Sequence, residues 1–217
     1  GENLRRELLE RGIPLTSTTD SEALTWMIAL AHGPDLASRV RQAMARFVGA
    51  YSLAVMTPDA LVGVRDPLGI RPLCLGRLNG GWVIASETCA LATVGATFER
   101  EIEPGEIVVI DAQGVRSYPT PEPPERQAMC LFELIYFARP DSLLMGERLH
   151  LVRQRMGAEL WREHPVEADV VIPLPDSATP AAIGFARASG IPYAEGLIKN
   201  RYIGRTFIQP DQRLREQ

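Results

Sequence analysis

The chain has 217 residues, 46% hydrophobic and 23% charged, which is typical of a globular protein with one large domain or two small ones. Its 23 lysines and arginines against 27 aspartates and glutamates give a net charge of −4, which excludes a whole-molecule positive field for nucleic acid or membranes. Three scattered cysteines, no export signal and no run of about 18 apolar residues predict a cytoplasmic protein without a disulfide framework.

Three helices are predicted at the start of the chain. Leucines on one side of residues 3–11 indicate the first helix. Thr19 and Glu22 have the spacing of a capping box, so a second helix is expected to begin at Asp20. An apolar stripe of helical period predicts the third helix over residues 35–47.

From Tyr51 onward the apolar pattern changes to short β-rich runs separated by turn signals such as Asn-Gly-Gly. This pattern predicts an antiparallel sheet region. The expected strands are residues 51–57, 61–66, 72–78, 82–87 and 106–112.

Residues 119–126 read PTPEPPER and form neither a helix nor a central strand, because four prolines remove backbone donors. A domain boundary is therefore placed here, between a first domain of residues 1–122 and a second of residues 123–217.

The second domain is predicted to be α/β. A helical pattern over residues 146–164 is followed by the apolar run 169–175, a helix over 178–190 and a strand over 191–198. A strand, a helix and a strand within about thirty residues indicate a βαβ unit of a parallel, doubly wound sheet.

Asp176 and Ser177 are candidate ligand-binding residues, because they lie where a predicted parallel strand passes into a helix. The alternative is that Asp176, Ser177 or Thr179 only caps that helix. Asp20 has two interpretations as well: a first-turn acid favoured by the helix dipole, or an acceptor for a ligand ammonium group.

Other polar residues are expected to be structural. Arg65, Asp66 and Arg71 surround a Pro-Leu-Gly turn, which an Arg–Asp pair would lock. The three histidines lack metal-ligand spacing and are expected at the surface or at helix ends. Cys130, before an apolar run, is most simply a small hydrophobic residue.

The last residues, from Lys199 to Gln217, are basic, with aromatic and aliphatic side chains between the cations and no regular period. Such a segment suits a lid over an anionic ligand, since cations bind phosphate and apolar residues dock on closure. A nucleic-acid patch is the rival interpretation, weakened by the acidic balance of the chain.

Seven stretches in order carry a resemblance to a known family: TTDSEAL, GVRDPLGIRPLCLG, VIASETCAL, EPGEIVVID, CLFELIYFARPDS, VVIPLPDSATPAAIGFA and GLIKNRYIGRTFIQPDQRLRE. The chain resembles the glutamine phosphoribosylpyrophosphate amidotransferases along almost its whole length. YFARPDS and KNRYIGRTFI are specific signals, whereas TTDSE is shared with other glutamine amidotransferases.

The resemblance implies an α/β chain with two parts. The first is part of an N-terminal-nucleophile hydrolase αββα sandwich that takes ammonia from glutamine, and the second is the start of a type I phosphoribosyltransferase parallel sheet. Together they would convert glutamine, phosphoribosylpyrophosphate and water into 5-phosphoribosylamine, glutamate and pyrophosphate, the first committed step of purine biosynthesis. Mg²⁺, inhibition by purine nucleotides and a homo-oligomer are implied too.

The resemblance also assigns residues. Asp20 matches the acceptor for the glutamine α-amino group, and Ser177 matches a hydroxyl at the Mg²⁺ and pyrophosphate site. Cys130 matches one ligand of the [4Fe-4S] cluster of some members. The flexible loop over phosphoribosylpyrophosphate corresponds to residues 199–208, with Lys199, Arg201, Tyr202, Arg205 and Ile208 as its binding and channel residues.

The sequence departs from the family at its ends. The family's nucleophile is an N-terminal cysteine, whereas this sequence has none before Cys74. The loop that binds the ribose phosphate has no counterpart either, so an internal fragment without activity of its own is expected. The alternatives are a non-catalytic ligand-binding or regulatory module, and a sugar-phosphate or asparagine-type amidotransferase, against which the sequence after Cys130 argues.

Overall fold

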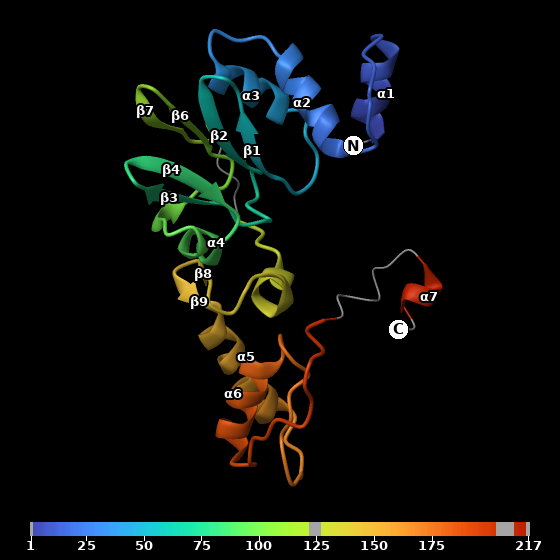
Figure 1. Cartoon of the computed structure of the whole chain (residues 1–217), viewed down its shortest axis with the longest axis vertical. Coiled ribbons are helices and arrows are strands. Elements are labelled where there is room, and N and C mark those ends of the chain that lie inside the picture. Colours follow the sequence, from blue (N-terminus) through green and yellow to red (C-terminus); the bar gives the residue numbers. More distant parts are fainter. Residues whose placement is uncertain (1, 122–126, 203–210, 216–217) are drawn as a thin grey trace. The chain divides into compact units, whose positions relative to one another are not determined.

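The computed structural model describes residues 2–121, 127–202 and 211–215 (Figure 1). The chain divides into two compact units. We call them unit 1, which comprises Gly1–Glu133 and Ser142–Gly146, and unit 2, which comprises Leu134–Asp141 and Glu147–Gln217. The domain boundary predicted after residue 122 lies in the segment 122–126, which the structure does not describe, so it stays a prediction.

The three predicted helices of unit 1 are confirmed. They are α1 (Glu2–Glu10), α2 (Asp20–Leu30) and α3 (Leu36–Met44). The helix α3 begins where the Asp35 carboxylate accepts a hydrogen bond of 2.7 Å from the backbone N–H of Ser38. That bond satisfies one of the unpaired donors of the first turn.

The predicted capping box at α2 is wrong in its partners. Thr19 is the N-cap residue, but its side chain makes no capping hydrogen bond. Glu22 reaches further back, and its carboxylate accepts from the backbone N–H groups of Thr16 and Ser17, each at 2.7 Å. The Glu22 carboxylate therefore holds the turn that precedes α2 and does not cap the first turn of the helix.

Two antiparallel sheets follow, as the alternating pattern predicted. The first has the strand order β1-β2-β6-β7 and the second the order β4-β3-β5. Their bounds are β1 Ser52–Met56, β2 Ala60–Arg65, β3 Cys74–Leu78, β4 Gly81–Ala85, β5 Thr97–Glu101, β6 Ile107–Asp111 and β7 Gly114–Tyr118.

The two sheets lie between helical layers. Val64 and Val109 of the first sheet pack with α1–α3, while Val108, on the opposite face of β6, packs with Leu75 of the second sheet. The far face of the second sheet, at Cys74, packs with Leu91 of α4 (Thr88–Thr93). Because alternate residues of a strand point to opposite faces, these clusters build a helix–sheet–sheet–helix arrangement.

Among the elements of unit 1 with five or more residues, α4, β5 and β7 were not predicted from the sequence. The strands β5 and β7 are edge strands of their sheets. Edge strands commonly carry charged residues, and β5 reads TFERE, with Glu99 paired to Arg77 at 3.2 Å. A charged edge lacks the apolar alternation on which strand prediction depends.

Unit 2 is built on two predicted helices, α5 (Leu149–Glu163) and α6 (Thr179–Ser189), which pack side by side (Figure 1). Their glycines permit a close approach. A Cβ at Gly157 would lie 1.9 Å from the carbonyl oxygen of Ala181, and one at Gly184 would lie 1.9 Å from that of Gln154. Each glycine thus faces the backbone of the other helix.

The predicted parallel pairing around α6 is present as a bridge between Val171 and Tyr193. The Val171 N–H donates to the Pro192 oxygen at 2.8 Å, and the Ala194 N–H donates to the Val171 oxygen at 3.0 Å. The other described elements are the π-helix Glu133–Phe137, β8 Leu143–Leu144, β9 Glu147–Arg148 and α7 Gln212–Arg215. No helix among the described residues is long and apolar enough to cross a membrane.

Candidate functional site

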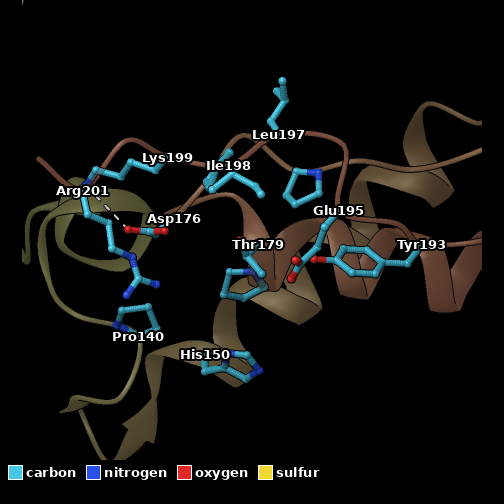
Figure 2. A pocket seen from close by; sticks show the side chains of 13 residues that line it. Pro140, His150, Asp176, Thr179, Tyr193, Glu195, Leu197, Ile198, Lys199 and Arg201 are labelled. Carbon is cyan, nitrogen blue, oxygen red and sulfur yellow. Dashed lines mark ion pairs between the residues drawn. The ribbon is translucent and has the colours of Figure 1, made fainter. Parts of the chain in front are cut away.

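A pocket of about 370 Å³ in unit 2 brings together polar residues from several segments (Figure 2). It lies beside the Val171–Tyr193 bridge and at the start of α6, where a parallel strand gives way to a helix. Ligands of open α/β sheets bind at this position. The pocket is lined by Pro140, His150, Pro173, Pro175, Asp176, Thr179, Pro180, Tyr193, Glu195, Leu197, Ile198, Lys199 and Arg201.

One part of the pocket lining, at Pro140, is attached to α5 by hydrogen bonds. The backbone N–H of His150 donates to the Pro140 oxygen at 2.7 Å. The guanidinium of Arg153, whose side chain is buried, donates to the carbonyl oxygens of Leu134 and Ala138, each at 2.7 Å. These bonds fix the segment 134–140 on the helix that also carries His150.

Asp176 and Lys199 face each other in the pocket, with Nζ and the carboxylate oxygen 3.6 Å apart (Figure 2). Both side chains remain accessible, at 75% for Asp176 and 51% for Lys199. The pair is therefore weak and open to a ligand that competes for either charge.

The helix-capping alternative for this segment is wrong. Ala178 is the N-cap residue of α6 and supplies no side-chain hydrogen bond. Within the described part of the chain, the side chains of Asp176, Ser177 and Thr179 make no hydrogen bond to the first turn. Their oxygens are available for other partners.

The structure describes some of the other predicted site residues and not others. Arg201 lines the pocket, whereas Ser177 lies in the turn before α6 and is not among the lining residues. Tyr202 is fully exposed, and its backbone N–H donates to Asn200 at 3.0 Å. Arg205 and Ile208 lie outside the described residues.

His150 and Glu195 are pocket residues that the sequence did not reveal. The histidine was expected at a helix end, and it is the second residue of α5, but its position in the pocket was not expected. Its spacing of four from Gln154 on one helix face is the signal that could have identified it. Glu195 follows the bridge residue Tyr193, and no pattern distinguishes it in the sequence.

The second candidate, Asp20, lies in unit 1 as the exposed first residue of α2. Its carboxylate makes no hydrogen bond or ion pair with any residue that the structure describes. The preceding turn is well ordered by hydrogen bonds: Arg5 donates to the carbonyl oxygens of Ser17 and Thr19, at 2.6 and 3.2 Å. The hydrogen bonds from Thr16 and Ser17 lower the pKa of Glu22 to about 2.

The predicted Arg–Asp lock at the Pro-Leu-Gly turn is wrong in its pairing, although all three residues are structural. The buried Arg65 donates to the carbonyl oxygens of Arg71 at 3.0 Å, Ile102 at 2.7 Å and Gly69 at 3.2 Å. The Asp66 carboxylate accepts from the backbone N–H groups of Leu68 and Ile70, both at 3.0 Å.

Arg71, the third residue of that turn, pairs with the carboxylate of Glu133 at 2.8 Å. Glu133 is buried, and burial raises its pKa despite the arginine. All three polar side chains therefore hold the turn through separate partners.

The resemblance implies Mg²⁺, and the donors present in the pocket fit it. The pocket offers hard oxygen ligands in Asp176, Glu195 and Thr179, and Mg²⁺ is commonly held by one or two carboxylates together with substrate phosphates. A [4Fe-4S] cluster needs four cysteines held together in space, so Cys130 would supply one ligand and the others would come from outside this sequence. No group of three or more His, Cys, Asp or Glu side chains that could hold a metal ion occurs among the described residues.

Comparisons with known proteins find similar sequences and structures. Residues 1–93 match the family model of a glutamine amidotransferase domain. The chain is 52% identical to the amidophosphoribosyltransferase of Synechococcus elongatus, across 98% of this chain and 44% of that protein.

Two solved structures match as well. The Bacillus subtilis glutamine phosphoribosylpyrophosphate amidotransferase, complexed with ADP and GMP, has a TM-score of 0.88 and 42% identity, and covers 99% of this chain and 47% of that one. A structure described as the allosteric regulatory enzyme of purine biosynthesis has a TM-score of 0.87 with 42% identity, over 99% of this chain and 46% of that one. The chain thus spans less than half of each protein that it matches.

Proposed function

We propose that this chain is part of an amidophosphoribosyltransferase, to whose members it is similar over the part that it spans, and that the protein that carries it makes 5-phosphoribosylamine. Glutamine supplies the ammonia and phosphoribosylpyrophosphate supplies the activated sugar, in the committed step of purine biosynthesis. The observation that carries the proposal is the pocket of unit 2, which sets Lys199 and Arg201 beside Asp176 at a strand-to-helix switch.

Unit 1 contributes to the glutamine site in this proposal. The Asp20 carboxylate is exposed, makes no hydrogen bond to another described residue and follows a turn to which Arg5 donates hydrogen bonds. An available carboxylate of this kind accepts the α-ammonium group of an amino acid through charge-assisted hydrogen bonds. Asp20 therefore orients glutamine without taking part in the bond changes.

Unit 2 binds phosphoribosylpyrophosphate. Lys199 and Arg201 donate to phosphate oxygens, and Arg205 and Ile208 are proposed to extend the site beyond the described residues. When a phosphate displaces the Asp176 carboxylate from Lys199, that carboxylate becomes free to hold a cation. Tyr202 is proposed to line the path by which ammonia arrives.

Mg²⁺ would be held by Asp176 of the pocket together with the pyrophosphate, where it would neutralise charge on the leaving group. The Ser177 hydroxyl, in the turn next to the pocket, is proposed as a further ligand. The chain's own residues orient the ligand, because Asp176 and Lys199 give up their mutual ion pair and each contacts a group of the ligand instead. Apolar lining residues such as Leu197 exclude water that would compete for the activated sugar. We also propose that purine nucleotides inhibit the protein, since the Bacillus subtilis relative was solved with ADP and GMP. The family resemblance is the basis for two further proposals, a cytoplasmic location and a homo-oligomer.

The proposal predicts that the glutamine site of unit 1 and the phosphoribosylpyrophosphate site of unit 2 can be impaired separately by substitution. In the protein that carries this chain, Asp20→Asn should raise the KM for glutamine about tenfold or more and leave the ammonia-dependent reaction unchanged, because ammonia bypasses the glutamine site. Lys199→Met should raise the KM for phosphoribosylpyrophosphate with either nitrogen source.

Arg155→Met is the matched control, because Arg155 is an exposed cation on α5 that pairs with Glu147 at 3.1 Å and does not line the pocket. It should leave both KM values unchanged. Loss of the ammonia-dependent reaction in Asp20→Asn, or equal effects of Lys199→Met and Arg155→Met, would contradict the assignment. Binding of both ligands without turnover would favour the non-catalytic module.

A further inference from the structure

A chain of hydrogen bonds connects the surface of unit 2 to the pocket. Arg187 on α6 donates from Nη1 to Oε1 of Gln154 at 3.2 Å. Gln154 on α5 is bonded in turn, through Nε2, to Nε2 of His150 at 2.9 Å. His150 lies one helical turn before Gln154 and lines the pocket (Figure 2).

The donors and acceptors of this chain fix the proton on the histidine. A guanidinium group can only donate, so the amide oxygen of Gln154 must face Arg187. The amide nitrogen of Gln154 then faces the imidazole ring and donates to it. Nε2 of His150 has to accept, so the ring is neutral and carries its proton on Nδ1.

The position of the ring is fixed as well. The backbone N–H of His150 is bonded to Pro140 at 2.7 Å, and Gln154 lies where α5 passes against Gly184 of α6. Nδ1 of His150 has no hydrogen-bond partner among the residues that the structure describes. His150 is half-buried in the pocket lining and its Nδ1 is not enclosed by protein atoms, so Nδ1–H is available to donate to a ligand oxygen in the pocket.

We propose that His150 is a substrate-binding residue that donates its Nδ1–H to an oxygen of the pocket ligand, and that Gln154 and Arg187 are positioning residues that hold it in this tautomer. This inference rests on the proposed function, in which the ligand is phosphoribosylpyrophosphate and its phosphate and hydroxyl oxygens all accept hydrogen bonds. A neutral donor adds an oriented hydrogen bond to a site whose charges come from Asp176, Glu195, Lys199 and Arg201.

The tautomer can be measured without any ligand. The chain has three histidines, so two-bond ¹H–¹⁵N correlation spectra of the ¹⁵N-labelled 217-residue chain would show three rings, with His150 identified by its absence in His150→Asn. We expect a protonated Nδ1 in the wild type. In Gln154→Glu a carboxylate oxygen should face the ring and place a proton on Nε2. A wild-type ring protonated only at Nε2 would overturn the inference.

Two isosteric variants test the contact with the ligand. The amide nitrogen of asparagine occupies the position of Nδ1, whereas that of glutamine occupies the position of Nε2. In calorimetric titrations of the protein that carries this chain with phosphoribosylpyrophosphate and Mg²⁺, His150→Asn should bind within about threefold of the wild type. His150→Gln and His150→Phe should bind about tenfold more weakly, the loss expected for one hydrogen bond.

Equal affinities of the asparagine and glutamine variants would overturn the proposed contact. Inorganic pyrophosphate serves as a second probe and should show the same order of affinities. If the wild-type protein binds neither compound, the proposed function fails, and the tautomer measurement alone then decides whether Gln154 orients His150.

Discussion

Two aspartates, one in each unit, follow the end of an extended segment and lie beside a proline, yet their surroundings are opposite. Asp66 in unit 1 is 1% exposed, and its carboxylate is used by the backbone N–H groups of its own turn. The side chain of Asp176 in unit 2 is 75% exposed, with the ammonium group of Lys199 3.6 Å away. The polar groups of this turn in unit 1 are therefore occupied in holding the fold, whereas those of the unit 2 pocket remain available for a ligand.

The same contrast applies to the arginines. Arg65 is buried and donates to three carbonyl oxygens of unit 1, while Arg201 lines the open pocket of unit 2. The difference predicts where substitutions will affect stability and where they will affect binding. The expected effects below range from large to small.

The packing of unit 2 depends most on the two helix-contact glycines. Gly157→Ala should destabilise unit 2 by about 3 kcal/mol, because its Cβ would lie 1.9 Å from a backbone oxygen that cannot move without separating α5 from α6. Trp161 of α5, which packs edge-on against Phe185 of α6, reports the loss in urea unfolding followed by fluorescence.

Gly81→Ala is the matched control, since its Cβ would meet its nearest neighbour at 3.3 Å, and it should change stability by no more than about 1 kcal/mol. A Gly157→Ala protein as stable as this control would show that the two helices do not need their close approach.

Substitution of the two aspartates compares the units directly. Asp66→Asn should destabilise unit 1 by about 2 kcal/mol, because one amide oxygen cannot replace a buried carboxylate that accepts two partly buried backbone hydrogen bonds. Asp176→Asn should change stability by less than about 0.5 kcal/mol while weakening ligand binding. Chemical unfolding followed at Trp82 for unit 1 and at Trp161 for unit 2 separates these effects. Similar losses of stability in the Asp66 and Asp176 variants would contradict the difference between the two units.

Glu106 provides a pH test within unit 1. Burial acts to raise its pKa, but hydrogen bonds from Arg100 at 2.7 and 2.8 Å, from Ser117 and from the Glu103 N–H outweigh it, so the pKa is lowered. A carboxyl with a lowered folded-state pKa adds stability at pH values above its unfolded pKa of about 4.3, and that stability is lost as the pH falls.

We therefore expect Glu106→Gln to lose about 1–2 kcal/mol at pH 7 and to show a weaker acid dependence of unfolding than the wild type between pH 5 and 3. Parallel stability curves of the two proteins over this pH range would contradict the role of Glu106.

The smallest effect is expected at the turn before α2. The pKa of Glu22, about 2, lies below that of a free carboxyl, so its hydrogen bonds to Thr16 and Ser17 persist until the pH falls well below 4. Amide exchange should accelerate locally at Thr16 and Ser17 in Glu22→Ala, with global stability little changed. Unchanged exchange at these two amides would show that the turn does not depend on Glu22.

The difference between the units also explains which features could be predicted from sequence. The apolar period of α3 and the apolar runs of β2 and β6 are strong because one or both faces are buried, and these elements were predicted. The strand β5 was not, because an edge strand with charges at Glu99 and Arg100 has no such period.

Site residues follow the same logic. Asp176 and Lys199 could be identified because they lie at a strand end and in a basic segment. His150 was missed, since its spacing of four from Gln154 does not show a binding role until the fold places the histidine in the pocket. The pairing of Arg71 with Glu133, 62 positions apart, likewise depends on tertiary structure.

Hydrogen–deuterium exchange of the protein that carries this chain, with and without phosphoribosylpyrophosphate and Mg²⁺, tests the central claim most directly. If the free polar groups of unit 2 form the sugar-phosphate site, the ligand should protect amides in residues 174–179 and 193–202 and leave the sheet residues 97–118 of unit 1 unchanged. Protection confined to unit 1, or none in the pocket segments at saturating ligand, would contradict the account.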